Sequence, residues 1–213
     1  MKRLFVLFSL VLSLILSGCN TSQPQQAEKG DFKFCSLEWG TDWETVQKSD
    51  IFKDAQYEVT ENGHRQVVWV DGLEYLGVKS EMAGLVFDVA NVTTANGLSS
   101  IFFQFSEEDE EVLLSELTEL YGERKTAYLD KNGVENPINP AGWVSEDTVE
   151  SVLTEEGRAY YISMFPEDYE QTRLDANLRS PLVSIRFDEE RNFVEFNGSV
   201  ASVVSFVQSE MKK

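Results

Sequence analysis

Histidine and cysteine are scarce in this chain of 213 residues, which contains one histidine and two cysteines. A zinc site needs about three or four such ligands, and a Ser-His-Asp triad would have to use His64, which follows Asn62-Gly63 in an expected turn. The chain also lacks a G-x-S-x-G element and a phosphate-binding glycine loop. We therefore expect no catalytic constellation, no metal site and no cofactor, and we classify the protein as a non-enzyme.

Basic side chains are also few, with 18 Lys and Arg against 37 Asp and Glu, which gives a net charge of −19. Nucleic acid and anionic lipid head groups repel such a surface. We therefore expect no nucleic-acid partner, and a partner attracted by charge would be cationic or neutral. The acidity can equally serve only to keep an exported domain soluble.

Long apolar runs are limited to one stretch at the start of the chain, Leu4 to Leu16. It is too short for the roughly 20 residues that a membrane-spanning helix needs. Lys2 and Arg3 precede it, and small residues follow it. A positive head, an apolar stretch and small residues in this order are typical of a bacterial secretory signal.

The end of this segment, Leu16-Ser17-Gly18-Cys19, resembles the signal of bacterial lipoproteins. The resemblance implies cleavage before Cys19 and acylation of its thiol, with palmitate as one of the attached chains. It places the protein at a bacterial membrane, lipid-anchored and exposed outside the cytoplasm. In a bacterium with two membranes, Asn20 would permit the outer membrane.

Three segments follow from this reading: a signal peptide over 1–18, a lipidated cysteine and flexible tether over 19–30, and a single domain over 31–213. If Cys19 carries lipid, Cys35 has no partner within the chain. We expect no structural disulfide, and we expect Cys35 to be a small buried side chain among apolar neighbours.

Two helices are expected early in the domain. The first covers 42–49, where Thr41 serves as the N-terminal cap and Glu44 lies at the capping-box distance. The second opens at Ser106, carries leucines at helical spacing and stops at Gly122.

Strands are expected between these helices. The ranges 56–60 and 66–70 flank Asn62-Gly63, which is a strong hairpin signal. Apolar residues alternate with others over 85–89 and 101–105, which predicts strands with one buried face.

A loop is expected over 128–142, and a second block of strands after it. Its members are 142–145, 148–154, 158–165 and 182–187, with a hairpin connection at 155–157. The secondary structure of the tail from Phe193 is ambiguous, because Val200, Val203, Val204 and Val207 fit a helical stripe while Gly198 and the valine content disfavour a helix. The order predicts an α+β fold, an antiparallel sheet with helices on one face, with two possible helix-then-strands repeats over 31–105 and 106–190.

Several short elements of this pattern resemble known families. They are Gly40-Thr41 with Val46, Ser106 with Leu117, Tyr121-Gly122-Glu123, and Trp143. Over about 32–187 the pattern resembles small bacterial lipoproteins of uncharacterised function. More distantly, it resembles the helix-plus-sheet repeat of the β-lactamase inhibitor protein and of the small lipoprotein of the outer-membrane β-barrel assembly machinery. The resemblance implies protein binding by an open sheet face, and it carries over no individual functional residue.

Tryptophan and tyrosine supply the candidate binding residues. Aromatic side chains on a sheet can bind a peptide or a sugar, because they offer large and rigid contact areas. We take Trp39, Trp143, Tyr160 and Tyr161 as the candidate binding surface, and we expect Trp43 and Trp69 to pack in the core. The expected partner is an envelope protein or peptide.

Two alternatives to a binding module stay open. The first is a small envelope hydrolase that uses paired carboxylates, since acidic residues are abundant. The second is a calcium-binding domain, for which 107–111 and Asp130-Lys131-Asn132-Gly133 are the acidic candidates.

Overall fold

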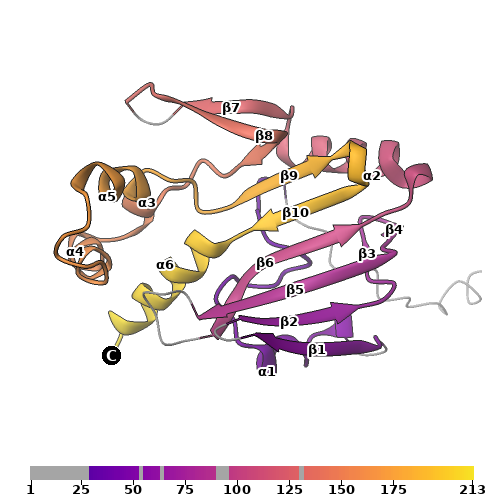
Figure 1. The fold of residues 1–213 in the computed structure, drawn as a ribbon, viewed down its shortest axis with the longest axis horizontal. Helices are drawn as coiled ribbons and strands as arrows, with labels where there is room; N and C mark the ends of the chain where they lie inside the picture. Colours follow the sequence, from indigo (N-terminus) through magenta and orange to yellow (C-terminus); the bar gives the residue numbers. More distant parts are fainter. Residues whose placement is uncertain (1–28, 53–54, 63–64, 90–95, 130–131) are drawn as a thin grey trace, which may run out of the picture.

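An eight-stranded antiparallel sheet is the centre of the structure, a computed structural model that describes residues 29–52, 55–62, 65–89, 96–129 and 132–213. The strand order is β1-β2-β5-β6-β10-β9-β8-β7 (Figure 1). The strands are β1 (Tyr57–Asn62), β2 (Arg65–Val70), β5 (Met82–Val89), β6 (Asn96–Gln104), β7 (Lys125–Leu129), β8 (Glu135–Val144), β9 (Ser184–Asp188) and β10 (Phe193–Asn197). A small second sheet pairs β3 (Glu74–Tyr75) with β4 (Val78–Lys79). The fold is α+β, as predicted.

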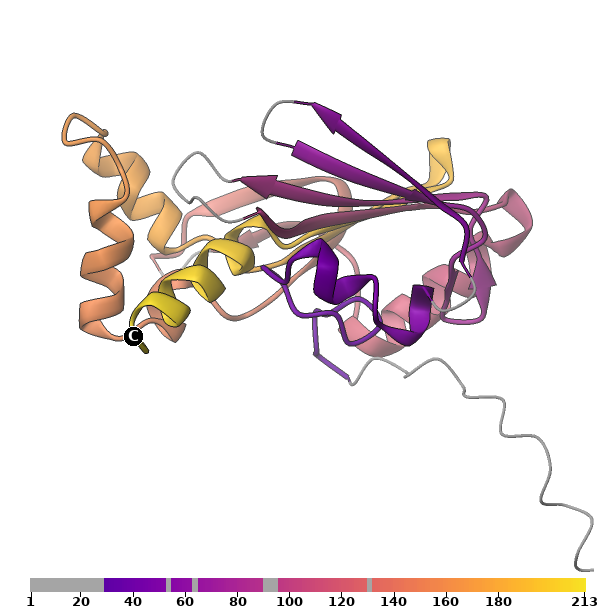
Figure 2. The ribbon, with the colours of Figure 1, turned by 90° about the horizontal axis from the view of Figure 1, so that it is seen from below.

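Six α-helices accompany the sheet in the described residues. They are α1 (Trp43–Val46), α2 (Glu110–Tyr121), α3 (Val149–Val152), α4 (Glu155–Ser163), α5 (Gln171–Leu178) and α6 (Ser199–Glu210). Figure 2 shows α1 and α2 on the same side of the sheet, and α3, α4 and α5 beyond one end of it. In the described residues, no helix lies over the other side of β1, β2, β5 and β6 (Figure 2).

The alternating pattern of the central strands decides which face of the sheet is buried. Leu85 and Phe87 on β5, and Ile101 and Phe103 on β6, are fully buried in the core on the helix side. The residues between them point to the opposite side, because successive side chains of a strand alternate. The predicted hairpin of β1 and β2 is confirmed, with continuous register from Tyr57↔Val70 to Asn62↔Arg65.

The second predicted helix is confirmed, and the first is shorter than predicted. A 3-10 turn over 107–109 leads into α2, which buries Leu113 and Leu117. At α1 the cap is Asp42, whose Oδ1 accepts a hydrogen bond from the Thr45 N–H at 2.8 Å. The helix ends at Val46, and a turn and a separate 3-10 segment follow it. The predicted range 42–49 was therefore too long.

The predicted strands over 148–154 and 158–165 are wrong, because both regions are helical. The Thr154 hydroxyl accepts a hydrogen bond from the Gly157 N–H at 3.1 Å, which caps α4. The range 155–157, predicted as a hairpin connection, is therefore the first turn of α4. Val149 and Tyr161 pack with Val207 of α6 in a second apolar cluster. The valines that favoured strands serve this helical packing instead.

The predicted loop over 128–142 is also wrong. It contains the end of β7 and most of β8, which pair as a hairpin next to β9. The tail from Phe193, which sequence left ambiguous, forms β10 and then α6. Strand β10 fills the centre of the sheet between β6 and β9, which joins the two halves of the chain.

Candidate functional site

The uncovered side of the sheet carries a row of aromatic side chains, which we call the aromatic strip: Trp69 on β2, Phe102 on β6 and Phe193 on β10. Trp69 lies opposite Gly84 of β5, and Gly84 lies opposite Phe102. All three aromatic residues are partly exposed. The strip therefore crosses four neighbouring strands on the side that α1 and α2 do not cover.

Direct ring contacts hold the strip together. The ring centroids of Trp69 and Phe102 are 5.1 Å apart at 68°, an edge-to-face contact. Those of Phe102 and Phe193 are 6.0 Å apart at 25°. A Cβ atom on Gly84 would lie 2.0 Å from the Phe102 ring, so the glycine provides the space in which this ring lies on the sheet. The Trp69 Nε1–H donates a hydrogen bond to the Thr60 hydroxyl at 3.1 Å.

Polar and charged side chains surround the aromatic strip. Glu58 lies opposite Trp69, and Glu195 lies opposite Phe102. The Glu195 carboxylate is 3.8 Å from the guanidinium of Arg186 on the neighbouring strand. An apolar centre with a polar rim is the usual anatomy of a protein-binding surface.

Trp69 is the clearest correction to the sequence-based assignment of aromatic residues. It was expected in the core, yet it lies on the uncovered side of β2, between the buried Val68 and Val70. The missed signal was a glycine in a strand, Gly84, which often marks close approach of a neighbouring group. Phe193 was missed because its segment had no clear periodicity.

The four predicted binding residues do not form one surface in the structure. Trp39 is buried and its Nε1–H donates to the Phe32 carbonyl at 2.9 Å. Trp143 is buried and donates to the Gly122 carbonyl. Tyr161 belongs to the second apolar cluster, where burial raises the pKa of its phenol to about 12, and Tyr160 packs against the same cluster. Trp39, Trp143 and Tyr161 are thus buried and Tyr160 is partly buried, and the structure does not bring the four together on one surface.

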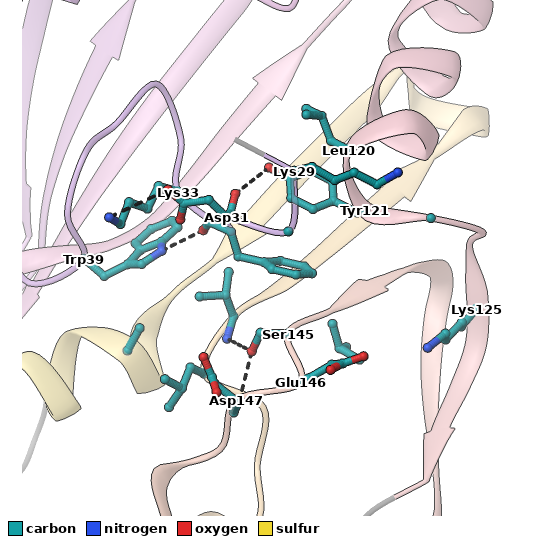
Figure 3. A pocket seen from close by; sticks show the side chains of 17 residues that line it. Lys29, Asp31, Lys33, Trp39, Leu120, Tyr121, Lys125, Ser145, Glu146 and Asp147 are labelled. Atoms are coloured by element: carbon teal, nitrogen blue, oxygen red, sulfur yellow. Dashed lines mark hydrogen bonds and ion pairs between the residues drawn. The ribbon is translucent and has the colours of Figure 1, made fainter. Parts of the chain in front are cut away.

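A pocket of about 690 Å³ lies where the described chain begins (Figure 3). One wall is the segment 29–33, held against α2 by the Gly30 N–H, which donates to the Leu120 carbonyl at 3.0 Å. The Tyr121 hydroxyl adds a bond to the Asp31 carbonyl at 3.2 Å. Residues 144–147 and residues 182–183, which directly precede β9, form the facing wall (Figure 3). The size is typical of small-ligand pockets.

The charges that line this pocket balance. They are Lys29, Lys33 and Lys125 against Asp31, Glu146 and Asp147. Lys33 lies 2.7 Å from Glu38 and 3.7 Å from Asp31, and the bond to Glu38 raises the pKa of its ammonium group. The geometry gives this pocket no preference for a ligand of either sign.

Ser145 is a hydroxyl side chain that lines the pocket beside Glu146 in the chain. Its Oγ donates to the Asp147 carbonyl at 3.1 Å and accepts from the Val183 N–H at 3.2 Å. Both bonds go to the backbone, and neither partner is a base that could activate a nucleophile. These contacts position the loop between β8 and α3 rather than prepare the hydroxyl for attack.

Cys35 is buried, as predicted, and free. Burial raises the pKa of its thiol to about 12. The thiolate is the reactive form of cysteine, so this side chain behaves as a small apolar group at neutral pH. Cys19 and His64 lie outside the described residues, as do Asp130 and Lys131 of the possible calcium loop.

The described residues provide neither a metal-binding cluster nor a membrane-spanning helix. Among them, no group of three or more His, Cys, Asp or Glu side chains is placed to hold a metal ion. Within the same ranges, no helix is long and apolar enough to cross a bilayer.

The chain was compared with protein-family models, with curated proteins and with solved structures. No family model matches it. No curated protein and no solved structure matches it either. The candidate functional site is therefore defined by this chain's own geometry, and the aromatic strip is its principal feature.

Proposed function

We propose that this protein is a membrane-anchored lipoprotein of the bacterial envelope whose domain binds another polypeptide through the uncovered side of its sheet, without catalysis. The observation that carries the proposal is the aromatic strip, in which the Phe102 ring contacts those of Trp69 and Phe193 on the side of the sheet opposite α1 and α2. Neither the hydrolase nor the calcium-binding alternative has a comparable observation in its favour among the described residues.

Exposed aromatic rings are costly to leave in water and effective when a partner covers them. Tryptophan and phenylalanine bury large areas and are rigid, and tryptophan is enriched among the residues that dominate binding energy. The Thr60 hydrogen bond and the Gly84 space fix two of the three rings before a partner arrives. Less side-chain entropy is then lost on binding, because the rings are already ordered.

Apolar area extends beyond the strip on the same side of the sheet. Met82, on β5 two residues before Gly84, is 38% exposed. Methionine adapts its shape to different partners. Together with the net charge of −19, this surface favours a polypeptide with apolar and basic side chains over an acidic polymer.

The proposed anchor is the lipid on Cys19. Nine residues, 20–28, separate Cys19 from Lys29, where the described chain begins, and the ten steps from Cys19 to Lys29 could reach about 33 Å if fully extended. Two or more acyl chains hold a protein at a membrane without help from its surface. The domain would then be free to meet partners near the membrane while its acidic surface stays off anionic lipid.

The anchor is tested by Cys19→Ala. We expect this variant to lose all palmitate labelling and to leave the membrane fraction or remain unprocessed, because its acyl acceptor is gone. The measurement is metabolic palmitate labelling with membrane fractionation. Cys35→Ala is the matched control, and we expect it to retain both the palmitate label and the membrane association. Retained palmitate labelling of Cys19→Ala would contradict lipid attachment at Cys19.

The binding side is tested by photocrosslinking in intact cells. A photoreactive phenylalanine analogue replaces Met82 on the uncovered side or, as the control, Val112, which is exposed on α2. We expect a discrete crosslinked polypeptide from position 82, absent from position 112 and lost when Phe102→Ala is added. Equal crosslinking from both positions, or none from position 82 in any growth condition, would contradict the proposal.

A further inference from the structure

In the part of the chain that the structure describes, strand β1 forms one edge of the sheet and pairs on one side only. It pairs with β2 at all six positions from Tyr57 to Asn62, and among the described residues no other strand pairs with it. Residues 57–61 are all exposed. An edge of this kind presents backbone N–H and C=O groups that can pair with another extended chain.

Three of the usual protections of an edge strand, lysine, proline and a bulge, are absent from β1. Its sequence YEVTEN contains no lysine and no proline, and its register with β2 runs without a bulge. Tyr57 and Val59 leave 45% and 39% of their surfaces exposed. Natural edges are commonly blocked by lysine, proline or a bulge, so this edge can accept a strand.

The charges of β1 select what it can accept. Glu58 and Glu61 are its ionisable carboxylates, and Glu58 lies on the same side as the aromatic strip. A second copy of this chain would bring the same two carboxylates to the junction, in a protein that already carries −19. Like charges directly opposite each other destabilise a strand pair, whereas opposite charges stabilise it.

We propose that β1 receives an extended segment of a different polypeptide as a ninth strand, with basic side chains opposite Glu58 and Glu61 and apolar ones opposite Tyr57 and Val59. Every strand pair of the sheet is antiparallel, so the added strand runs antiparallel to β1. Its sequence then reads basic, any, apolar, basic, apolar. The inference rests on the proposed function in that its partner is a polypeptide.

The added strand would continue the surface already described. Glu58 lies opposite Trp69, and the Thr60 hydroxyl accepts the Trp69 hydrogen bond. A chain paired with β1 therefore lies one strand away from the first ring of the aromatic strip. Backbone pairing would supply affinity, and the alternating side chains would supply specificity, as in other cases of strand addition.

The test is an NMR titration of the complete, detergent-solubilised protein with capped heptapeptides. The probe TKTVKVT places lysine and valine in the inferred order, and TVTKVKT exchanges them at equal charge and composition. We expect amide shifts and new hydrogen-exchange protection in β1, and binding at least about tenfold tighter for TKTVKVT. A third peptide, TETVEVT, carries glutamate in place of the two lysines of TKTVKVT. We expect the native protein to bind TKTVKVT more tightly than TETVEVT, and the double variant Glu58→Lys with Glu61→Lys to bind TETVEVT more tightly.

A matched control changes the same charge elsewhere. Glu111→Lys with Glu119→Lys places two lysines on exposed positions of α2 and should leave the peptide preference unchanged. Equal binding of the two lysine peptides, shifts spread over the acidic surface, no binding at millimolar peptide, or no reversal in the β1 variant would each overturn the inference. Crosslinking from position 82 that persists in that variant would show that the proposed function stands without strand addition.

Discussion

Replacing Phe103 with alanine is expected to lower the free energy of unfolding by about 3–5 kcal/mol. Its ring is fully buried on the helix side of β6, where it contacts the ring of Tyr75 edge-on with centroids 6.3 Å apart. Removing a buried ring loses its transfer free energy and leaves a cavity that the surrounding strands cannot fill. The measurement is urea-induced unfolding followed by tryptophan fluorescence.

The neighbouring substitution Phe102→Ala provides the control for this prediction. Phe102 is the next residue on the same strand, but it lies on the uncovered side and is partly exposed. We expect a loss of about 1 kcal/mol, because contacts with Trp69 and with the Gly84 backbone are lost but no closed cavity forms. Equal losses for the two variants would show that Phe102 is a core residue and would remove the basis of the aromatic strip.

Gly142→Ala is expected to destabilise the protein by about 3 kcal/mol or more, because a Cβ atom has no room there. It would lie 1.9 Å from the carbonyl oxygen of Ile185, a backbone atom of the neighbouring strand β9. Gly142 pairs with Arg186 at the start of the contact between β8 and β9. The clash can be relieved only by separating these strands, which changes the position of β8 beside the pocket.

Gly157→Ala is the matched control, since the same change occurs where space exists. Its Cβ would lie 3.4 Å from the Thr154 hydroxyl, an ordinary contact, within helix α4. Alanine is favoured over glycine in a helix by roughly 0.5–1 kcal/mol, so we expect this variant to be slightly more stable. A Gly142→Ala variant as stable as Gly157→Ala would contradict the close approach of β8 and β9.

The first half of the sheet could be predicted because its local signals agree with its tertiary environment. Asn62-Gly63 between two alternating segments predicted the hairpin of β1 and β2. The alternation of Ile101, Phe102 and Phe103 correctly assigned these side chains to opposite sides of β6. Such strands have one buried face, so the period-two pattern is strong.

The region after α2 could not be predicted, because tertiary contacts override its local preferences. Val149 and Val152 favour a strand by propensity, but α3 packs them against α6, an element about 50 residues later in the chain. Thr154 and Gly157 look like a turn, yet the same two residues cap α4. The partner helix, which is distant in sequence, decides between these readings.

The sequence indicated the type of candidate site, a sheet face with aromatic side chains, but not the residues that form it. An open sheet face was implied by the resemblance, but the named residues Trp39 and Trp143 are buried. Aromatic content does not distinguish a packing ring from an exposed one, since both occur in strands. The distinction needs the register that sets Trp69, Gly84 and Phe102 side by side on one face.

The most direct test of polypeptide binding by the aromatic strip is the affinity of the partner recovered by crosslinking for the native protein and for Phe102→Ala with Phe193→Ala. Isothermal titration and urea unfolding are measured on the same preparations, so that lost binding is not confused with lost folding. We predict that the double variant stays folded and binds at least about tenfold more weakly, because two rings of the strip are gone. Unchanged affinity in the folded double variant would contradict the account.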